Sequence, residues 1–479
     1  MKDLLVMKFG GTSMGSAERI RVAGELIAAE QRRRPVLAVV SAMSKVTDLL
    51  LDTLRHAEVG DEAGLESNIA KIRERHVDTC RALLPEDRQE RVLKGIQSLV
   101  SDFARIAGGI RMLGERPPRS VDEAIAVGER LSALLMAAYL ESKGIPSTDV
   151  NAAGVVVTDS VFGNANPQMG PTRRKAHEVL VPLLKAGRAP IVTGFNGATA
   201  DGRPTTLGRG GSDFSASILA SVLDAGELWI WTDVDGIMTA DPRLVPDAAV
   251  LEEVSYSEAA ELAYNGAKVL HPRTLAPLVE KKIPVWSKNS FAPEKPGTRI
   301  VPRISAAWGP RAVTSLSKVV LVSIEPLSPE LNVTQVMGRA LDALGRVNVE
   351  LLALSSSSYR QSLCFLLRKE EMETALASLE SALSLELAHG YLRPLEVNED
   401  VGLLAVVGEG MRGTPGLAGR IFTAISREKI NIIAIAQGSS ELTISIVVRK
   451  DGLEKAVQAV HEECRMGEQA RQAGPERGA

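Results

Sequence analysis

The sequence is poor in cysteine and in long apolar runs, and each shortage excludes a class of protein. Three cysteines in 479 residues, far apart and odd in number, make neither a disulfide framework nor the ligand spacing of a zinc site. We therefore read Cys80, Cys364 and Cys464 as free thiols and expect a cytoplasmic protein. No run of about 18 apolar residues occurs, so we expect no membrane span.

Positive charge is not in excess either. Lysine and arginine total 56 against 59 aspartates and glutamates, a formal net charge of −3, so nothing is left over to neutralise a phosphate backbone. Nucleic acid is not an expected partner. Hydrophobic residues at 45% and charged residues at 24% are typical of a globular protein, and this length favours two to four domains.

The N-terminal part alternates buried strands with helices. The stretch 4–9, apolar except for Lys8, reads as a buried strand that ends in a glycine-rich turn, an amphipathic helix follows, and an all-apolar strand occupies 36–40. Strand, loop, helix, strand is the unit of a parallel α/β sheet. Further strand candidates follow at 191–193 and 228–231. We expect residues 1–305 to form one α/β domain.

The C-terminal part repeats itself once. Residues 347–358 (VNVELLALSSSS) align without gaps to 430–441 (INIIAIAQGSSE), and each copy has a helical segment before it and a strand after it. Two copies are too few for a solenoid. We therefore predict two α+β modules, at 318–396 and 400–465, followed by a flexible tail at 466–479.

The motif KFGGTS at 8–13 has the residues of a phosphate-binding loop. A lysine ends a buried strand, and two glycines let the backbone come close to a ligand, so that backbone amides can hold phosphate oxygens. The lysine precedes the glycines, so the motif is not a P-loop. On this motif alone, a tight turn with a snorkelling lysine stays an alternative.

The motif TLGRGGSD at 206–213 places three glycines around Arg209, Ser212 and Asp213. The guanidinium of Arg209 suits a carboxylate, and Asp213 can orient a lysine or a magnesium ion. The alternative is an ordinary surface turn.

Two more motifs follow. WTDVDGIMTADPR at 231–243 comes after a strand, where α/β sheets bind ligands, although Asp-Gly and Asp-Pro also form plain loops. NGAKVLHP at 265–272 adds Lys268 as a phosphate or nucleotide contact. We read His271 as structural.

Taken together with SAMSKVT at 41–47 and GER at 128–130, these motifs resemble those of aspartate kinases, of the amino-acid kinase superfamily, over essentially the whole chain. The C-terminal part, with GEGMR at 408–412, is most similar to the kinase portion of bifunctional aspartokinase/homoserine dehydrogenases, whose dehydrogenase domain we do not expect here. The resemblance implies an amino-acid kinase domain followed by two ACT modules.

The resemblance implies transfer of the γ-phosphoryl group of ATP to the β-carboxylate of L-aspartate, with Mg²⁺ as cofactor, at the entry to lysine, threonine and methionine biosynthesis. Lys8, Arg209 and Asp213 would be catalytic, and the magnesium ligands are unknown. ATP would contact Lys8, Phe9, Gly10, Gly11, Thr232, Asp233, Met238, Arg243, Lys268 and Val269. Aspartate would contact Ser41, Thr47, Glu129, Arg209 and Ser212. Met238 is a departure, because the family usually has tyrosine there.

No catalytic triad or paired general base is evident, and the reaction needs none. The attacking carboxylate has an ordinary pKa of about 3.9 and is already ionised at pH 7, so catalysis reduces to positioning and charge neutralisation. The GxGxxG pattern at 408–413 suggests a dinucleotide site by itself, but too few residues follow it for a Rossmann domain. Two alternatives stay open. One is a superfamily kinase acting on glutamate, acetylglutamate, carbamate or UMP, and the other is a non-catalytic amino-acid sensor.

ACT modules bind amino acids where two copies pair, so the resemblance implies a homodimer or larger homo-oligomer and a regulatory amino acid. The second copy has Gln437 where the first has Leu354, and threonine-sensitive relatives have glutamine in both. We expect one effector class per subunit, centred on Asn431, Gln437 and Ser439, with threonine favoured and lysine possible. The alternative is that the modules serve only as a dimerisation surface.

Overall fold

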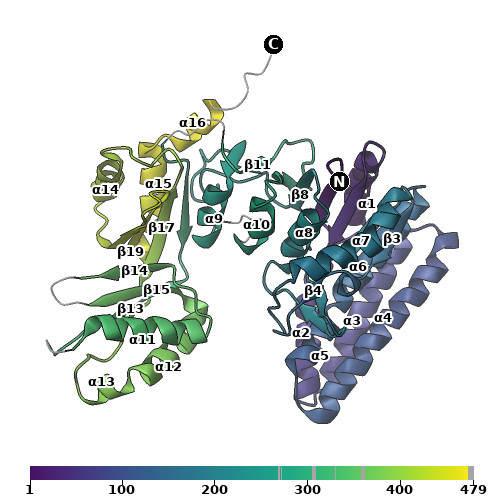
Figure 1. Ribbon diagram of the computed structural model, residues 1–479, viewed down its shortest axis with the longest axis horizontal. Coiled ribbons are helices and arrows are strands. Elements are labelled where there is room, and N and C mark those ends of the chain that lie inside the picture. Colours follow the sequence, from purple (N-terminus) through teal and green to yellow (C-terminus); the bar gives the residue numbers. More distant parts are fainter. Residues whose placement is uncertain (268–269, 271, 305–308, 329–330, 358–361, 473–479) are drawn as a thin grey trace. The chain divides into compact units, whose positions relative to one another are not determined.

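The computed structural model of the protein describes residues 1–267, 270, 272–304, 309–328, 331–357 and 362–472 (Figure 1). Over these residues the chain divides into two compact units. Unit 1 comprises 1–237, 252–256 and 270–302, and unit 2 comprises 238–251, 257–269 and 303–479. Two segments between residues 238 and 269 therefore belong to unit 2, whereas the sequence analysis assigned 1–305 to one domain.

Unit 1 is built on a sheet that, in the described residues, has eight strands in the order β3-β5-β2-β1-β8-β10-β11-β9. Its pairings are parallel apart from the antiparallel pair β10–β11. The central strands β1, β2 and β5 are buried along their whole length, as a sheet covered on both faces requires. The strands are β1 (Leu5–Phe9), β2 (Val36–Val40), β3 (Ser147–Val150), β5 (Ala189–Thr193), β8 (Glu227–Thr232), β9 (Glu253–Ser255), β10 (Val285–Asn289) and β11 (Thr298–Val301).

Helices cover both faces of this sheet. The helices α1 and α6 pack on one face and α7, α8 and α10 on the other, while α2 to α5 lie outside α1 and α6. A small sheet joins β4 (Val157–Thr158), β6 (Asn196–Thr199) and β7 (Pro204–Thr206). The helices are α1 (Ala17–Gln31), α2 (Val46–Glu58), α3 (Glu62–Leu83), α4 (Glu86–Leu113), α5 (Pro118–Ile125), α6 (Val127–Ser142), α7 (Met169–Lys185), α8 (Gly211–Val222) and α10 (Pro272–Val279).

Unit 2 holds the predicted pair of α+β modules. Among the described residues each has a four-stranded antiparallel sheet, β14-β15-β13-β16 in the first and β12-β17-β19-β18 in the second. The strands are β12 (Ala312–Leu316), β13 (Val319–Ile324), β14 (Ala353–Ser356), β15 (Leu363–Arg368), β16 (Glu396–Asn398), β17 (Val401–Val407), β18 (Ile432–Gln437) and β19 (Thr443–Arg449). The helices are α9 (Tyr256–Tyr264, whose first residue belongs to unit 1), α11 (Val333–Arg346), α12 (Met372–Ala382), α13 (Ser384–Ala388), α14 (Leu417–Arg427), α15 (Leu453–Glu463) and α16 (Met466–Gln472).

The two modules are interleaved. The strand β12 precedes the first module in the chain, yet it pairs with β17 of the second. It takes the edge position that β16 holds beside β13 in the first module. Residues 306–317 lie outside both predicted modules, because a strand that completes a distant sheet has no local signal of its partner.

The C-terminal end also differs from the expected tail. Residues 466–472 form α16, and the side chain of Met466 is fully buried in the core of the second module. Arg471 donates to the carboxylate of Asp247 at 2.8 Å.

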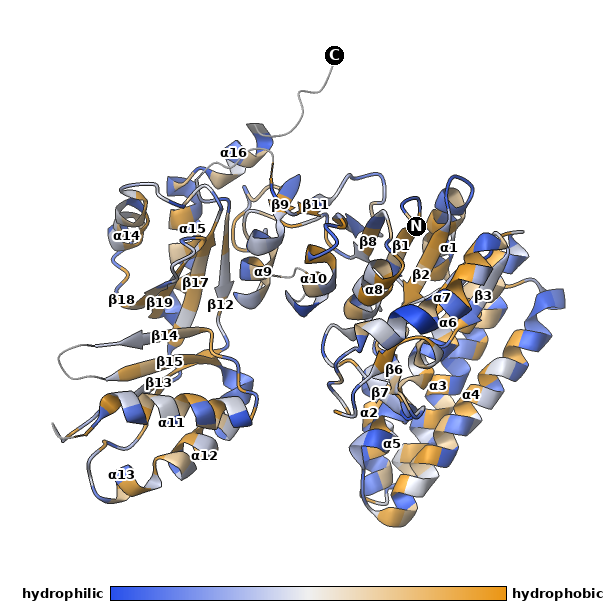
Figure 2. Ribbon diagram, in the orientation of Figure 1, coloured by the Kyte–Doolittle hydropathy of each residue, from blue (hydrophilic) through white to orange (hydrophobic). Residues whose placement is uncertain are grey.

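Figure 2 shows apolar residues concentrated along β1, β2 and β17, and polar residues on one side of α3 and α4. Within the described residues, no helix is both long and apolar enough to cross a bilayer.

Candidate active site

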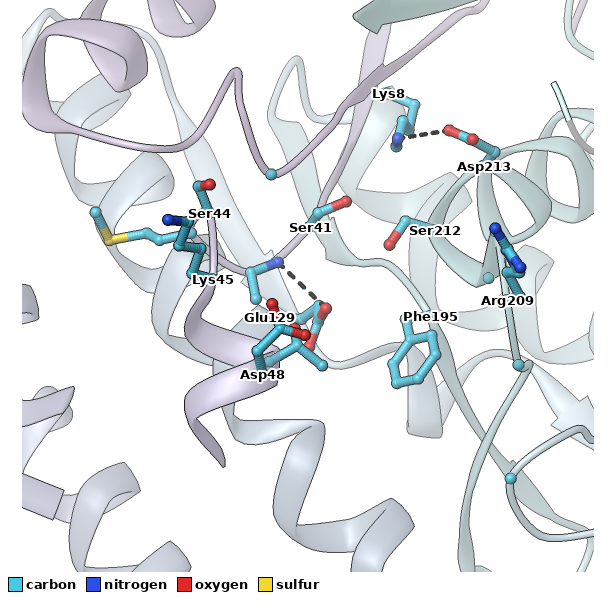
Figure 3. A pocket seen from close by; sticks show the side chains of 18 residues that line it. Lys8, Ser41, Ser44, Lys45, Asp48, Glu129, Phe195, Arg209, Ser212 and Asp213 are labelled. Atoms are coloured by element: carbon cyan, nitrogen blue, oxygen red, sulfur yellow. Dashed lines mark hydrogen bonds and ion pairs between the residues drawn. The ribbon is translucent and has the colours of Figure 1, made fainter. Parts of the chain in front are cut away.

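A cavity of about 560 Å³ lies in unit 1 at the carboxyl ends of β1 and β2 (Figure 3). Parallel α/β sheets bind ligands at this edge. Segments far apart in the sequence meet there: the end of β1, the loop after β2, the start of α6 and the start of α8. Eight predicted site residues line the cavity, namely Lys8, Gly11, Ser41, Thr47, Glu129, Arg209, Ser212 and Asp213.

Lys8 lies in the central strand β1, and its side chain lines the cavity. Its neighbours Met7 and Phe9 point into the core shared with α1 and α6, so Lys8 points to the other face, towards α8. There its Nζ lies 2.5 Å from Oδ1 of Asp213, in the first turn of α8. A Cβ at Gly10 would lie 3.3 Å from this Nζ. The ammonium therefore sits over the glycine loop, held in place by Asp213.

Glu129 is a buried carboxyl group that has no cationic partner among the described residues. The residue is 3% exposed, and its Oε1 accepts a hydrogen bond from the backbone N–H of Ala42 at 3.2 Å. The Oε2 atom has no hydrogen-bond partner among the described residues. Burial raises the pKa of Glu129 to about 8. A cationic ligand group placed in the cavity would supply the missing partner and restore the ionised form.

The start of α8 adds positive potential. The helix begins at Gly211, after Gly210 with a φ of 71°, and free backbone N–H groups at a helix N-terminus favour anions. Figure 3 shows Arg209 and Ser212 on this side of the cavity, opposite Ser44 and Lys45. The cavity thus combines cationic groups for anions with one buried carboxylate for a cation.

Several lining residues were not among the predicted site residues. Ser44, Lys45 and Asp48 lie within or beside the SAMSKVT motif, so a signal was present, and Lys45 has a φ of 64°. Phe195 and Gly163 carried no signal, because only the folding of the loops around β6 and β7 brings them to the cavity.

The predicted nucleotide residues are more dispersed. The Phe9 ring is buried and stacks on Trp231 with 6.1 Å between centroids, so its side chain is a core contact. Thr232 ends β8, the neighbour of β1, and Asp233 follows it, but neither residue lines the cavity. The backbone N–H of Gly10 bonds to the carbonyl of Trp231 at 3.4 Å, which ties the glycine loop to β8.

Other predicted nucleotide residues belong to unit 2. Met238 forms a bridge with Val250, and Arg243 pairs with Asp241 at 2.5 Å. Thr239 between them contacts Nε2 of His461 through its hydroxyl at 2.9 Å, so this segment folds with α15. Lys268, Val269 and His271 lie outside the described residues.

A hydroxyl network that the sequence analysis missed connects the glycine loop to β8. The Ser290 hydroxyl donates to the carbonyl of Thr232 at 3.1 Å, so the buried 2.8 Å contact between Ser13 and Ser290 has Ser13 as donor. Arg19 donates to the Ser290 carbonyl at 2.5 Å and to its hydroxyl at 3.0 Å. Ser290 therefore holds the two loops at a defined spacing.

In the described residues, no group of three or more His, Cys, Asp or Glu side chains is placed to hold a metal ion. Magnesium in kinase sites is usually held by substrate phosphates and one or two carboxylates. Asp213, at the glycine-loop end of the cavity, is a carboxylate that fits this pattern.

The predicted effector residues are not brought together within one chain. Gln437 ends β18 and Ser439 lies in the following turn, whereas Asn431 precedes the first residue of β18. Gln437 is six positions after Asn431 along an extended strand, a separation of roughly 20 Å. The three side chains are exposed.

Comparison with known proteins identifies relatives over the whole chain. The amino acid kinase family model matches residues 3–289, and an ACT domain model matches residues 404–464. The chloroplastic bifunctional aspartokinase/homoserine dehydrogenase 1 of Arabidopsis thaliana is 34% identical, over 95% of this chain and 50% of that protein. The chain thus spans about half the length of the bifunctional relatives. The aspartokinase of Schizosaccharomyces pombe is 30% identical, over 96% of this chain and 93% of that protein.

Comparison with solved structures identifies the same kind of relative. E. coli aspartokinase III in complex with aspartate and ADP has a TM-score of 0.83 at 30% identity, covering 96% of this chain and 99% of that one. The same enzyme in complex with lysine and aspartate has a TM-score of 0.77 at 29% identity, with the same coverage.

Proposed function

Because the chain belongs to the aspartokinases of the amino acid kinase family, we propose that it transfers the γ-phosphoryl group of ATP to the β-carboxylate of L-aspartate, giving 4-phospho-L-aspartate and ADP. The observation that carries this proposal is the cavity that combines the Lys8–Asp213 pair, Arg209 and the buried Glu129. The structure of a relative with aspartate and ADP supports it.

Aspartate has three charged groups, and the cavity has a counterpart for two of them. The partnerless oxygen of Glu129 suits the ammonium, and the guanidinium of Arg209 suits the α-carboxylate. Hydroxyls of Ser41, Thr47 and Ser212 provide neutral hydrogen bonds. The β-carboxylate is then left to face the phosphoryl group, and no base is needed because it is already ionised.

ATP would place its phosphates on Lys8 and the glycine loop, with its nucleoside on the loops after β8. In the transfer, a β-carboxylate oxygen forms a bond to the γ-phosphorus while the bond to the bridging oxygen breaks and its electron pair leaves with ADP. Lys8 and the loop amides offset charge on the phosphoryl oxygens. Mg²⁺, brought by ATP and assisted by Asp213, would neutralise the phosphates further. Nucleotide contacts from Thr232, Asp233, Met238, Arg243, Lys268 and Val269 stay part of the proposal.

Regulation by an amino acid is part of the proposal. The match to an ACT domain and the lysine complex of a relative support a regulatory amino acid. We place the effector at the β18 turn, on Gln437 and Ser439, with threonine favoured over lysine. Asn431 lies at the other end of the strand, so it joins the site only where a second module contributes. We also propose a homo-oligomer in the cytoplasm, at the entry to lysine, threonine and methionine biosynthesis.

Coupled ADP release with purified protein, ATP and Mg²⁺ tests the function. L-Aspartate should support turnover, whereas glutamate, acetylglutamate, carbamate and UMP should support little. Equal or faster turnover of glutamate or UMP would show that the substrate is wrong. Aspartate binding without any turnover would favour the amino-acid sensor.

A further inference from the structure

Asp122 on α5 is a buried carboxylate outside the substrate contacts. Its side chain accepts hydrogen bonds from the backbone N–H of Gly163 at 2.8 Å and from the N–H and hydroxyl of Thr206 at 2.9 and 2.8 Å. The residue is 2% exposed. Burying a charge at this depth is costly unless hydrogen bonds compensate it, and Asp122 accepts three of them.

The two loops that donate to Asp122 both reach the cavity. Gly163 lines it directly, and Thr206 begins the TLGRGGSD segment that carries Arg209. Asp122 therefore ties the loop at 159–167 to the end of β7, from which the loop at 207–210 continues. A backbone bond from the N–H of Ala165 to the carbonyl of Thr206, 2.8 Å long, lies alongside.

Arg273 on α10 holds the same two loops by their acceptors. Its guanidinium donates to the carbonyl of Leu207 at 3.3 Å, to that of Ala165 at 2.9 Å and to the side chain of Asn166 at 2.8 Å. It also lies over the Phe214 ring, 4.9 Å from the centroid. The Asp122 carboxylate thus accepts hydrogen bonds from both loops, and the Arg273 guanidinium donates hydrogen bonds to both loops.

Arg209 depends on this support because the glycines on either side of it leave the backbone pliable. It stands between Gly208 and Gly210, whose φ values of 74° and 71° lie in the left-handed region. Glycine adopts many backbone conformations at little cost, so the path of the backbone at Arg209 is set by what anchors the loop from outside. The nearest such anchors along the chain are Leu207, whose carbonyl accepts from Arg273, and Thr206, whose N–H and hydroxyl donate to Asp122.

We propose that Asp122 is a positioning residue for recognition of the substrate α-carboxylate, acting through Thr206 on Arg209, with Arg273 holding the opposite side of the same loops. The inference rests on the proposed function, because it assigns Arg209 to that carboxylate. It adds two residues that touch no substrate themselves.

Substitutions at Asp122 separate positioning from charge. Asp122→Ala leaves the buried donors of Gly163 and Thr206 without acceptors. Asp122→Asn can keep them: the amide oxygen accepts from both backbone N–H groups, and the amide nitrogen donates to the Thr206 hydroxyl. Glu123→Ala, an exposed carboxylate on the same helix, is the matched control.

Initial rates with aspartate and ATP varied separately test the proposal. We expect Asp122→Ala to raise the KM for aspartate at least ~10-fold with the KM for ATP within about twofold, while Asp122→Asn and Glu123→Ala stay close to wild type. Calorimetric titration with aspartate should show the same loss of affinity. An unchanged aspartate KM in Asp122→Ala, or equal rises in both KM values, would overturn the inference.

Two further arms keep the test decisive. If Asp122→Ala does not fold, Thr206→Val removes only the hydroxyl donor and should raise the aspartate KM about threefold to tenfold, again without changing that for ATP; no change would overturn the inference. Wild-type protein that releases no ADP with aspartate refutes the proposed function instead, and this outcome is distinct from a normal Asp122→Ala variant of an active enzyme.

Discussion

Glu129 imposes a pH dependence on aspartate binding whose sign follows from its burial. The pKa of about 8 means that at pH 7 only about one Glu129 carboxyl in ten is ionised. The substrate ammonium needs the ionised form. Below about pH 8, aspartate binding must therefore release a proton, and each unit of lower pH should weaken binding by about tenfold.

The substitution Glu129→Gln removes both the charge and the titration. A hydrogen bond to a charged group contributes about 1.5 to 3 kcal/mol, whereas ionising the carboxyl costs about 1.4 kcal/mol at pH 7 and about 2.7 kcal/mol at pH 6. The variant should therefore bind aspartate roughly 10- to 100-fold more weakly than wild type at pH 8 and nearly as well as wild type at pH 6.

Isothermal titration between pH 6 and 8, in buffers of different ionisation enthalpy, measures both the affinity and the proton release. Asp48→Asn is the control, because Asp48 is a carboxylate that lines the same cavity, and this variant should keep the pH slope. A wild-type affinity that is flat from pH 6 to 8, or binding without proton release, would refute the role of Glu129.

The same titration should affect stability without ligand. The pKa of Glu129 is raised above its ordinary value of 4.5, so its contribution to folding is fully present below about pH 4.5 and is lost as pH rises through about 8. The melting temperature of ligand-free wild type, compared with that of Glu129→Gln, should fall over this range. Parallel curves for the two proteins would contradict the buried assignment.

Three further predictions concern the phosphates, the nucleotide and the effector. Lys8→Ala or Asp213→Ala should lower kcat at least ~10²-fold with folding intact, since a transition-state charge contact is lost. An unchanged kcat in both variants would contradict the proposed charge neutralisation. Ser290→Ala should raise the KM for ATP and leave that for aspartate unchanged, because it removes the hydroxyl link between the glycine loop and β8 and leaves the Gly10–Trp231 backbone bond; the reverse pattern in initial rates would contradict this. Gln437→Ala should weaken amino-acid inhibition several-fold with little effect on uninhibited kcat; if Leu354→Ala does so instead, the effector lies in the first module.

The sequence alone determined the parallel-sheet domain, the repeated modules and eight of the residues that line the cavity. Strand β2 is a short all-apolar run and β1 departs from one only at Lys8, a pattern that a sheet covered on both faces requires. Lys8 and Arg209 could be found because polar residues beside glycines at strand and helix ends have few structural reasons to be there. The pKa of Glu129 could not be found, since the spacing of GER says nothing of how deeply its carboxylate is buried.

Only the tertiary structure decided what depends on contacts between distant segments. The pairing of β12 with β17 across the first module, the arrival of Phe195 and Gly163 at the cavity, and the separation of Asn431 from Gln437 along β18 all belong to this class. So do Asp122 and Ser290, whose partners lie 84 and 277 residues away. A hydrogen bond between such distant residues produces no periodic pattern in the sequence. Its donor and acceptor come within bonding distance only when folding brings the two loops together.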